Sequence, residues 1–404
     1  MLERSHFETL DSADPLATLR DRFQLPTGVI YLDGNSLGPL PSHVPAVVER
    51  VVRQEWGSDL IRSWNDNGWW TLAQEVGERI APLIGAPSGS VIAGDTTTIV
   101  LYKAVGGARR LRPGRRVILT DDGNFPTDLY ALRSLAGQVD AEMAAVAPEA
   151  VSDAIDDSVA VVALTHVDYR TGRRHDMAAI TAAAHAAGAV MVWDLSHSAG
   201  AMDLDLSESD MALGCGYKYL NGGPGAPAFV YVRPDHLTAF ENPIAGWWGH
   251  RDPFAMDTRF TPADGIRRLA VGTQPILSMV ALHAALEIFE GVDMGEVRRK
   301  SEVLVADFIT LVEERLPGFE IVTPRDPSGR GSHVSLAHPE ARRIMAALIA
   351  RGVIGDLRPP NLLRFGLAPT YLRHLDIWEA VEILVDIMET AAWRETKGAA
   401  GPVT

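Results

Sequence analysis

The chain has 404 residues, of which 37 are Lys or Arg and 52 are Asp or Glu, so its formal net charge is −15 with histidine neutral. Hydrophobic residues make up 47% and charged residues 22%, which is typical of a globular protein and excludes a disordered chain or a collagen-like repeat. At roughly 150 residues per domain, this length predicts two to three domains.

Three further properties exclude classes of protein. The sequence has no run of about 20 apolar residues of the kind that spans a bilayer, and its first residues (MLERSHFETLDSADP) lack the apolar stretch of an export signal. Cys215 is the only cysteine, which excludes an intrachain disulfide and a zinc site built from cysteines. The acidic charge disfavours nucleic-acid binding, which needs clustered Lys and Arg. We therefore expect a cytoplasmic protein that binds neither membranes nor nucleic acids.

Short apolar runs alternate with alanine-rich segments of helical length through the first two thirds of the chain. Strands are predicted to start at Val117 (VILT), Val159 (VAVVAL), Val190 (VMVWD) and Ala228 (AFVYV). Asp176–Ala187 is the clearest helix, because Asp176 is placed to cap its start and Gly188 to end it. This alternation is typical of an α/β fold, in which helices cover both faces of a mostly parallel sheet and ligands bind at the carboxyl ends of its strands.

After about residue 285 the pattern changes to that of a smaller α+β domain. It comprises a predicted amphipathic helix at Glu296–Leu316, a strand in SHVSLAH, a helix at Glu340–Arg351 and the segment LLRFGLAP. We divide the chain into an N-terminal segment (1–45) that packs with the small domain, a large domain (46–285) and a small C-terminal domain (286–404).

Lys218 lies in a glycine-rich segment (GCGYKYLNGGPG) just before a predicted strand, where packing does not require a lysine. A lysine that forms an imine needs a desolvated pocket and glycines that let a flat cofactor approach the backbone. Taken alone, the segment also fits a surface lysine.

Asp194 ends a predicted apolar strand in MVWDLSHSAG. A carboxylate there is placed either to keep a pyridinium nitrogen protonated or to cap a following helix. His197, three residues later, either lines the same pocket or satisfies local hydrogen bonds.

The segment GDTTT (Gly94–Thr98) lies between a predicted strand and a predicted helix. Hydroxyls and free backbone N–H groups at a helix start form an anion site, most often for phosphate. The chain has neither a GxGxxG after a strand nor a GxxxxGK[ST] motif, so it supports neither a dinucleotide fold nor a P-loop.

The order of these three features is that of a pyridoxal-phosphate enzyme of the aspartate-aminotransferase superfamily, which the chain resembles across its length. From Tyr31 to Tyr371 it resembles the kynureninase family in particular. The segments that carry this resemblance are YLDGNSLGPLP at Tyr31, NFPTD at Asn124, GYKYLNGGPG at Gly216, GWWGH at Gly246 and GTQP at Gly272.

The resemblance implies a role for each matching residue. The implied catalytic residues are Lys218, which would bind pyridoxal 5'-phosphate covalently, Asp194, which would hold its pyridine nitrogen, and Tyr217, a candidate proton relay. Arg364 would bind the substrate α-carboxylate, with Asn35 and Ser36 at the aryl end of the pocket. Cofactor contacts are implied for Thr96, Thr97, Phe125, Asp128, Thr165, Asp194, His197, Tyr217, Lys218, Trp247 and Thr273. No metal is implied.

Several of these residues also allow a purely structural interpretation. Phe125, which would stack on the cofactor ring, equally fits the hydrophobic core, and Asp128 equally fits the stabilisation of a helix start. The cluster Trp56, Trp64, Trp69 and Trp70 fits either a pocket wall or the core.

The family cleaves L-kynurenine hydrolytically at its Cβ–Cγ bond, which gives anthranilate and L-alanine in tryptophan catabolism. The resemblance further implies a homodimer with the cofactor site at the subunit interface, where Trp247 and Thr273 come from the partner subunit. The choice between kynurenine and its 3-hydroxy form stays open.

Three alternatives remain. A cysteine desulfurase needs a mobile nucleophilic cysteine, whereas Cys215 lies three residues before Lys218, where a buried small side chain is expected. An aminotransferase is disfavoured by GWWGH and YLDGNSLG. A non-catalytic relative is disfavoured by the joint presence of Lys218, Asp194 and Arg364.

Overall fold

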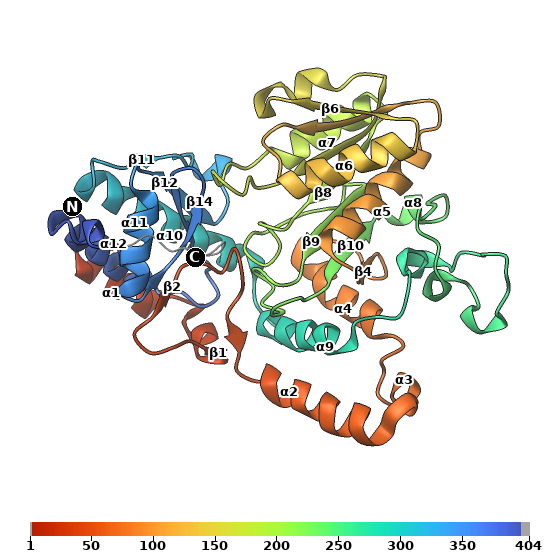
Figure 1. Cartoon of the computed structure of the whole chain (residues 1–404), viewed down its shortest axis with the longest axis horizontal. Helices are drawn as coiled ribbons and strands as arrows, with labels where there is room; N and C mark the ends of the chain where they lie inside the picture. The colour runs from red at the N-terminus through yellow and green to blue at the C-terminus, as the bar shows by residue number, and fades with distance from the viewer. Residues whose placement is uncertain (1, 397–404) are drawn as a thin grey trace.

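The computed structural model describes residues 2–396, and a seven-stranded sheet forms the centre of its large body (Figure 1). The strand order is β4-β10-β9-β8-β7-β5-β6, and only β10 runs antiparallel to its neighbours within the described residues. The strands are β4 (Val91–Ala93), β5 (Val117–Asp121), β6 (Glu142–Val146), β7 (Val159–Thr165), β8 (Val190–Asp194), β9 (Met211–Cys215) and β10 (Ala228–Val232). The predicted α/β class with a mostly parallel sheet is confirmed.

The central strands are buried on both faces. Every residue of β7, β8, β9 and β10 is buried, which explains why these segments are almost continuously apolar instead of alternating with polar residues. All four predicted strand starts, at Val117, Val159, Val190 and Ala228, match observed strands.

Helices cover this sheet and separate its parallel strands along the chain. The main ones are α4 (Leu72–Ile80), α5 (Thr97–Arg110), α6 (Pro126–Gln138), α7 (Met177–Ala186) and α9 (Ile276–Ala285). The predicted cap of α7 is confirmed, since the Asp176 carboxylate accepts a hydrogen bond from the Ala179 N–H at 3.0 Å. Gly188 follows the helix with φ +76°, a conformation that glycine adopts without steric cost.

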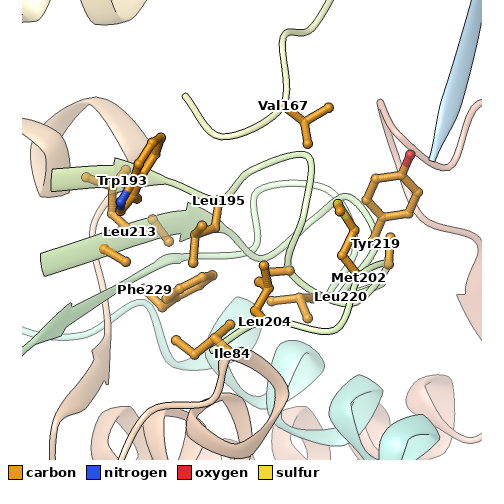
Figure 2. Packing of buried hydrophobic residues seen from close by; sticks show 14 of the residues in the cluster. Ile84, Val167, Trp193, Leu195, Met202, Leu204, Leu213, Tyr219, Leu220 and Phe229 are labelled. Atoms are coloured by element: carbon orange, nitrogen blue, oxygen red, sulfur yellow. The ribbon is translucent and has the colours of Figure 1, made fainter. Parts of the chain in front are cut away.

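The core beneath the site joins strands, loops and helices through apolar side chains. In Figure 2, Leu213 of β9 and Phe229 of β10 lie above Ile84, while Leu220 and Tyr219 continue the cluster toward the small body. Tyr219 is buried, and its hydroxyl donates to the Ser332 carbonyl at 3.3 Å. The segment that carries Lys218 is therefore anchored by its neighbours.

The smaller body combines a four-stranded sheet with helices from the C-terminal part of the chain. Its sheet has the order β11 (Glu320–Ile321), β12 (His333–Ala337), β15 (Leu362–Gly366) and β14 (Asp356–Arg358), and its helices are α10 (Met294–Arg315), α11 (Ala341–Ala350) and α12 (His374–Glu389). The long helix predicted at Glu296–Leu316 corresponds to α10.

N-terminal residues join this smaller body. Helix α1 (Arg4–Ala13) packs on α12, and β2 (Ile30–Tyr31) pairs with β13 (Val353–Ile354). Other short strands and α-helices are β1 (Phe23–Gln24), β3 (Leu40–Pro41), α2 (Val44–Arg50), α3 (Ser63–Asp66) and α8 (Pro234–Leu237). The division at residues 45 and 285 stays a prediction.

Between residues 2 and 396, none of the helices is both long enough and apolar enough to cross a membrane.

The contact between α4 and β4 leads to a stability prediction. A Cβ on Gly77 would lie 2.1 Å from the Val91 carbonyl oxygen, whereas a Cβ on Gly137, also helical, would meet nothing within 4 Å. We expect Gly77→Ala to destabilise the protein by about 1–3 kcal/mol through overpacking, and the control Gly137→Ala to stabilise it by about 0.5–1 kcal/mol. Thermal unfolding midpoints measure both effects, and an unchanged midpoint for Gly77→Ala would contradict the packing.

Candidate active site

A cavity of about 430 Å³ opens at the carboxyl ends of the parallel strands. Thr165 ends β7, Asp194 ends β8, and Lys218 follows the end of β9. The cavity is lined by Leu37, Asp95, Thr96, Thr97, Thr98, Phe125, Thr127, Asp128, Thr165, Tyr169, Asp194, Ser196, His197, Tyr217, Lys218, Pro224, Gly225 and Ala226. Nine of the eleven residues predicted to contact the cofactor are therefore brought together, and their individual roles stay predictions.

Lys218 contacts a neutral histidine. Its Nζ lies 3.0 Å from His197 Nε2 and 5.9 Å from the centre of the Tyr217 ring. Burial, reinforced by the positive charge of Lys218, lowers the pKa of His197 well below its usual range. The His197 ring is therefore uncharged, and its Nε2 can accept a hydrogen bond from the Lys218 ammonium.

The other described lysines, Lys103 and Lys300, form buried ion pairs. The chain has four, Lys103, Lys218, Lys300 and Lys397, and the last lies outside the described residues. Lys103 Nζ lies 2.6 Å from Asp95 Oδ2, and Lys300 Nζ lies 2.7 Å from Asp14 Oδ2. Both are buried in ion pairs, so Lys218 is the described lysine that is placed to react inside this cavity.

Two buried carboxyl groups, those of Asp128 and Asp194, are hydrogen-bonded to each other at the base of the cavity. Burial raises the pKa of both, and the charge of Asp194 raises the pKa of Asp128 further, well above its usual range. Asp128 therefore keeps its proton and donates a hydrogen bond to Asp194, which also accepts a hydrogen bond from the Ser196 N–H at 2.7 Å. The pair carries one negative charge.

Asn124 organises the polar edge of the cavity, although no role was predicted for it from the sequence. Its side-chain oxygen accepts from Thr165 Oγ1 at 2.5 Å and from the Phe125 N–H at 2.7 Å, while its amide nitrogen donates to Thr120 Oγ1 at 3.1 Å. Thr165 Oγ1 also lies 3.4 Å from Asp128 Oδ2. The only signal in the sequence was its position in NFPTD, directly after a strand.

Phe125 presents its ring to the cavity. It is 41% exposed, which excludes the alternative interpretation as a core residue, and it contacts Tyr169 edge-to-face at 5.0 Å between ring centres. Tyr169 was not predicted as a site residue from the sequence, although its loop leaves the carboxyl end of β7, where ligand-binding residues gather.

The start of α5 offers an anion site. Thr96 is the N-cap residue, but its side chain makes no capping hydrogen bond, and the first N–H groups of a helix have no partner within the helix. Thr96, Thr97 and Thr98 all line the cavity. Hydroxyls and N–H groups in this arrangement suit a phosphate.

Tyr217 is half-buried beside Lys218, and its carbonyl accepts from the Gly38 N–H at 2.8 Å. Burial raises the pKa of its hydroxyl, with a further contribution from Cys215. The hydroxyl therefore stays protonated and is available as a donor.

Arg364 is 1% exposed, and in the described chain it lies behind the cavity lining. Its Nε donates to Asp356 Oδ1 at 2.8 Å, its Nη1 to the Tyr169 carbonyl at 2.7 Å and its Nη2 to Ser36 Oγ at 2.7 Å. Ser36 also donates to Asp356 at 2.8 Å. The structure thus groups Ser36 with Arg364, and neither residue lines the cavity that holds Lys218.

Asn35 is fully buried away from the cavity lining. A Cβ on Gly366 would lie 2.1 Å from its Oδ1, so Asn35 packs directly on the small-body strand β15.

Trp247 and Thr273 line a second cavity, of about 650 Å³, together with Trp64, Trp70, Trp248 and Phe254. Within the described chain they are separate from the cavity that holds Lys218. The tryptophan cluster divides accordingly: Trp64 and Trp70 line the second cavity, Trp69 is buried with its Nε1 donating to Glu55 at 2.7 Å, and Trp56 is exposed.

The donor set of the first cavity fits pyridoxal 5'-phosphate. Thr96 to Thr98 suit its phosphate, Asp194 its pyridine nitrogen, Lys218 its aldehyde carbon and Phe125 its flat ring. The described residues contain no group of three or more His, Cys, Asp or Glu side chains that could hold a metal ion.

Comparisons with known proteins identify the relatives of the chain. The family model of the kynureninase C-terminal domain matches residues 297–384. A curated kynureninase from Burkholderia pseudomallei (strain 1106a) is 51% identical over 405 residues, which covers 98% of this chain and 97% of that protein. A curated kynureninase from Pseudomonas fluorescens is 47% identical over 408 residues, with 98% of each covered.

Solved structures share the fold at low sequence identity. A cysteine desulfurase from Escherichia coli has a TM-score of 0.78 at 20% identity, covering 95% of this chain and 99% of that one. A cysteine desulfurase from Thermococcus onnurineus NA1 has a TM-score of 0.77 at 19% identity, covering 92% and 97%. Because half of the residues are identical to those of curated kynureninases over nearly the whole chain, the chain belongs to the kynureninase family.

Proposed function

We propose that the chain catalyses hydrolytic cleavage of the Cβ–Cγ bond of L-kynurenine, giving anthranilate and L-alanine, with pyridoxal 5'-phosphate as cofactor. The observation that carries this proposal is 51% and 47% identity to kynureninases over 98% of the chain. The grouping of Lys218, Asp194 and Phe125 in one cavity supports it.

When bound, pyridoxal phosphate supplies an electron-withdrawing ring that accepts the electron pair released at the substrate α-carbon. Lys218 Nζ takes the α-proton, and the neutral His197 beside it accepts a hydrogen bond from the resulting ammonium. Asp194, which holds the charge of the Asp128–Asp194 pair, keeps a proton on the ring nitrogen. The protonated hydroxyl of Tyr217 donates the proton that the substrate β-carbon needs after cleavage.

Arg364 binds the substrate α-carboxylate. A guanidinium holds a carboxylate through two parallel hydrogen bonds, which lysine does not reproduce. Asp356 accepts from both Nε and Nη2 of Arg364, while Ser36 contacts Nη2 and the Tyr169 carbonyl contacts Nη1. Substrate binding therefore exchanges the contacts of Ser36 and Tyr169 for the carboxylate, while Asp356 stays in place.

A homodimer accounts for Trp247 and Thr273. Both are predicted to contact the cofactor phosphate but line the second cavity of their own chain. Three residues of that cavity carry exposed apolar side chains, namely Ile61 (76%), Phe254 (66%) and Trp247 (42%). Contiguous exposed apolar groups mark interaction surfaces, so we place a second copy of the chain there, with its own cofactor cavity facing these residues.

The single cysteine, a buried free thiol, suits the reducing cytoplasm as the compartment. Membership of the kynureninase family supports tryptophan catabolism as the context. A cysteine desulfurase activity has no support from Cys215, since burial raises the pKa of its thiol and leaves it a poor nucleophile.

Lys218→Ala tests the lysine. The wild-type protein should show the visible absorption of lysine-bound cofactor and release anthranilate, measured by its fluorescence, from kynurenine; parallel assays with 3-hydroxykynurenine give the substrate preference. The variant should lose the absorption band, because it lacks the lysine that binds the cofactor. Its rate should fall at least about 10³-fold, because it also lacks the proton acceptor. The control Lys300→Arg keeps the ion pair with Asp14 and should keep both the absorption band and the rate.

A Lys218→Ala protein with an intact absorption band refutes the assignment of Lys218, and a wild-type protein that is inactive on both substrates refutes the function.

Arg364→Lys tests the carboxylate site. We expect the KM for kynurenine to rise at least about tenfold, which corresponds to 1.4 kcal/mol, while cofactor affinity stays unchanged because Arg364 lies outside the cofactor cavity. The matched control is Arg343→Lys, an exposed arginine of α11 that should behave as wild type. Equal losses of cofactor and substrate affinity would contradict the assignment.

Mixing two inactive variants tests the dimer. If Trp247 completes the partner's site, Trp247→Ala and Lys218→Ala are each inactive, but a mixed dimer contains one intact site. Unfolding and refolding them together should recover about one quarter of wild-type activity, because half of the dimers are mixed and one of their two sites is whole. No recovery, with mixed dimers present by mass spectrometry, would place Trp247 in its own chain's site.

A further inference from the structure

Two buried histidines beside Lys218 have ring nitrogens without partners. His197 Nδ1 has no hydrogen-bond partner among the described residues, and the same holds for both ring nitrogens of His333. The two side chains are 3% and 0% exposed. A buried polar atom left unpaired costs free energy, so such atoms are normally satisfied by protein groups or by ordered water.

The two rings are close to each other but come from different bodies of the fold. Their centres are 5.4 Å apart, with an interplanar angle of 55°. His197 follows β8 of the large sheet, whereas His333 begins β12 of the small one and pairs with Gly366 of β15. The loop at Gly172 closes over His333, since a Cβ there would lie 2.8 Å from the His333 carbonyl oxygen.

The contact with Lys218 determines which nitrogen of His197 carries the proton. A neutral imidazole has one N–H donor and one acceptor. With the Lys218 amine as the donor in this contact, Nε2 is the acceptor and the proton sits on Nδ1. This N–H needs an acceptor, and a neutral His333 has one ring nitrogen free to accept.

His333 is suited to that role by its surroundings. The pKa of His333 is lowered to about 3, mainly by burial. The positive charges of Arg364, Lys218 and Arg358 also lower this pKa, and the opposite effect of Asp356 is smaller than their combined effect. His197 faces the same cations and His333 itself. Both rings are therefore neutral, and each is able to donate one hydrogen bond and accept one.

We infer that His333 is a positioning residue for the catalytic lysine: through one buried water molecule it accepts the hydrogen bond of His197 Nδ1–H and so keeps Nε2 free for the Lys218 ammonium. Water is the bridge because the described His333 nitrogens lie outside hydrogen-bonding geometry of Nδ1, and a bridging water satisfies two such groups at little cost.

The inference rests on the proposed role of Lys218 and gives His333 an effect on one step. When Lys218 Nζ takes the substrate α-proton, the C–H bond breaks, an N–H bond forms, and the new ammonium donates to Nε2. If His333 is lost, His197 is free to move its proton to Nε2, where it opposes the ammonium. Because β12 belongs to the small body, this step also depends on how the small body sits against the large one.

The first test measures the tautomer directly. In the cofactor-free protein labelled with ¹⁵N-histidine, nitrogen chemical shifts distinguish protonated from unprotonated ring nitrogens, and His197→Gln identifies the His197 signals. We expect the Nδ1–H tautomer in the wild type and a shift toward Nε2–H in His333→Phe. An Nε2–H tautomer in the wild type overturns the inference without any variant of His333.

The second test measures proton transfer apart from C–C cleavage, as exchange of the α-proton of L-alanine with D₂O. His333→Phe should slow exchange at least about tenfold, within the range of positioned acid–base groups, while His333→Gln, which keeps an acceptor, should stay close to wild type. His338→Phe, just beyond the other end of β12, is the matched control and should not change the rate. The effect of His333→Phe should disappear in a His197→Gln background.

Equal losses in His333→Phe and His333→Gln, or an undiminished effect without His197, would show that His333 acts through packing and would overturn the inference. A protein that exchanges the α-proton but does not cleave kynurenine would refute the proposed function and leave this inference standing.

Discussion

The parallel pairing of β8 with β9 is the constraint on which the site depends. Asp194 stands opposite Leu213 in this register, so the chain that leaves β9 turns beside the end of β8 and brings Lys218 to 3.0 Å from His197. Both strands are buried throughout, and a slip of one residue would turn every side chain to the opposite face. The apolar sheet thus fixes the distance between Lys218 and His197.

Burial then determines the charges inside the cavity. Water-poor surroundings disfavour every charged group that lacks a partner. His197 is therefore neutral, and Asp128 stays protonated and donates a hydrogen bond to Asp194. One negative charge remains on the Asp128–Asp194 pair, where we propose that the cofactor nitrogen binds, and one amine remains on Lys218, where we propose that its aldehyde carbon binds. This division of charge follows from the fold before any ligand binds, and it is the division that pyridoxal-phosphate chemistry requires.

The sequence predicted the elements that depend on local patterns. The buried strands, the helix capped by Asp176 and the order of threonines, aspartate and lysine all follow from apolar runs, capping chemistry and motif spacing. The contacts that cross the chain were not predictable from such patterns. Tyr169 meets Arg364 across 195 positions, and Asn124 meets Thr165 across 41. Such pairs are set by how elements distant in the chain pack together, within the large sheet for Asn124 and between the two bodies for Tyr169, which neither periodicity nor propensity encodes.

The assignment of Lys218 as the lysine that binds the cofactor can be tested most directly by locating the cofactor on the chain. Borohydride reduction of the cofactor-loaded protein fixes the lysine-bound cofactor, and peptide mass spectrometry locates it among the four lysines. We expect the label on Lys218, because Lys103 and Lys300 are held in buried ion pairs. Label on either of these, or on Lys397, would contradict the assignment of the cavity at the ends of β8 and β9 as the active site.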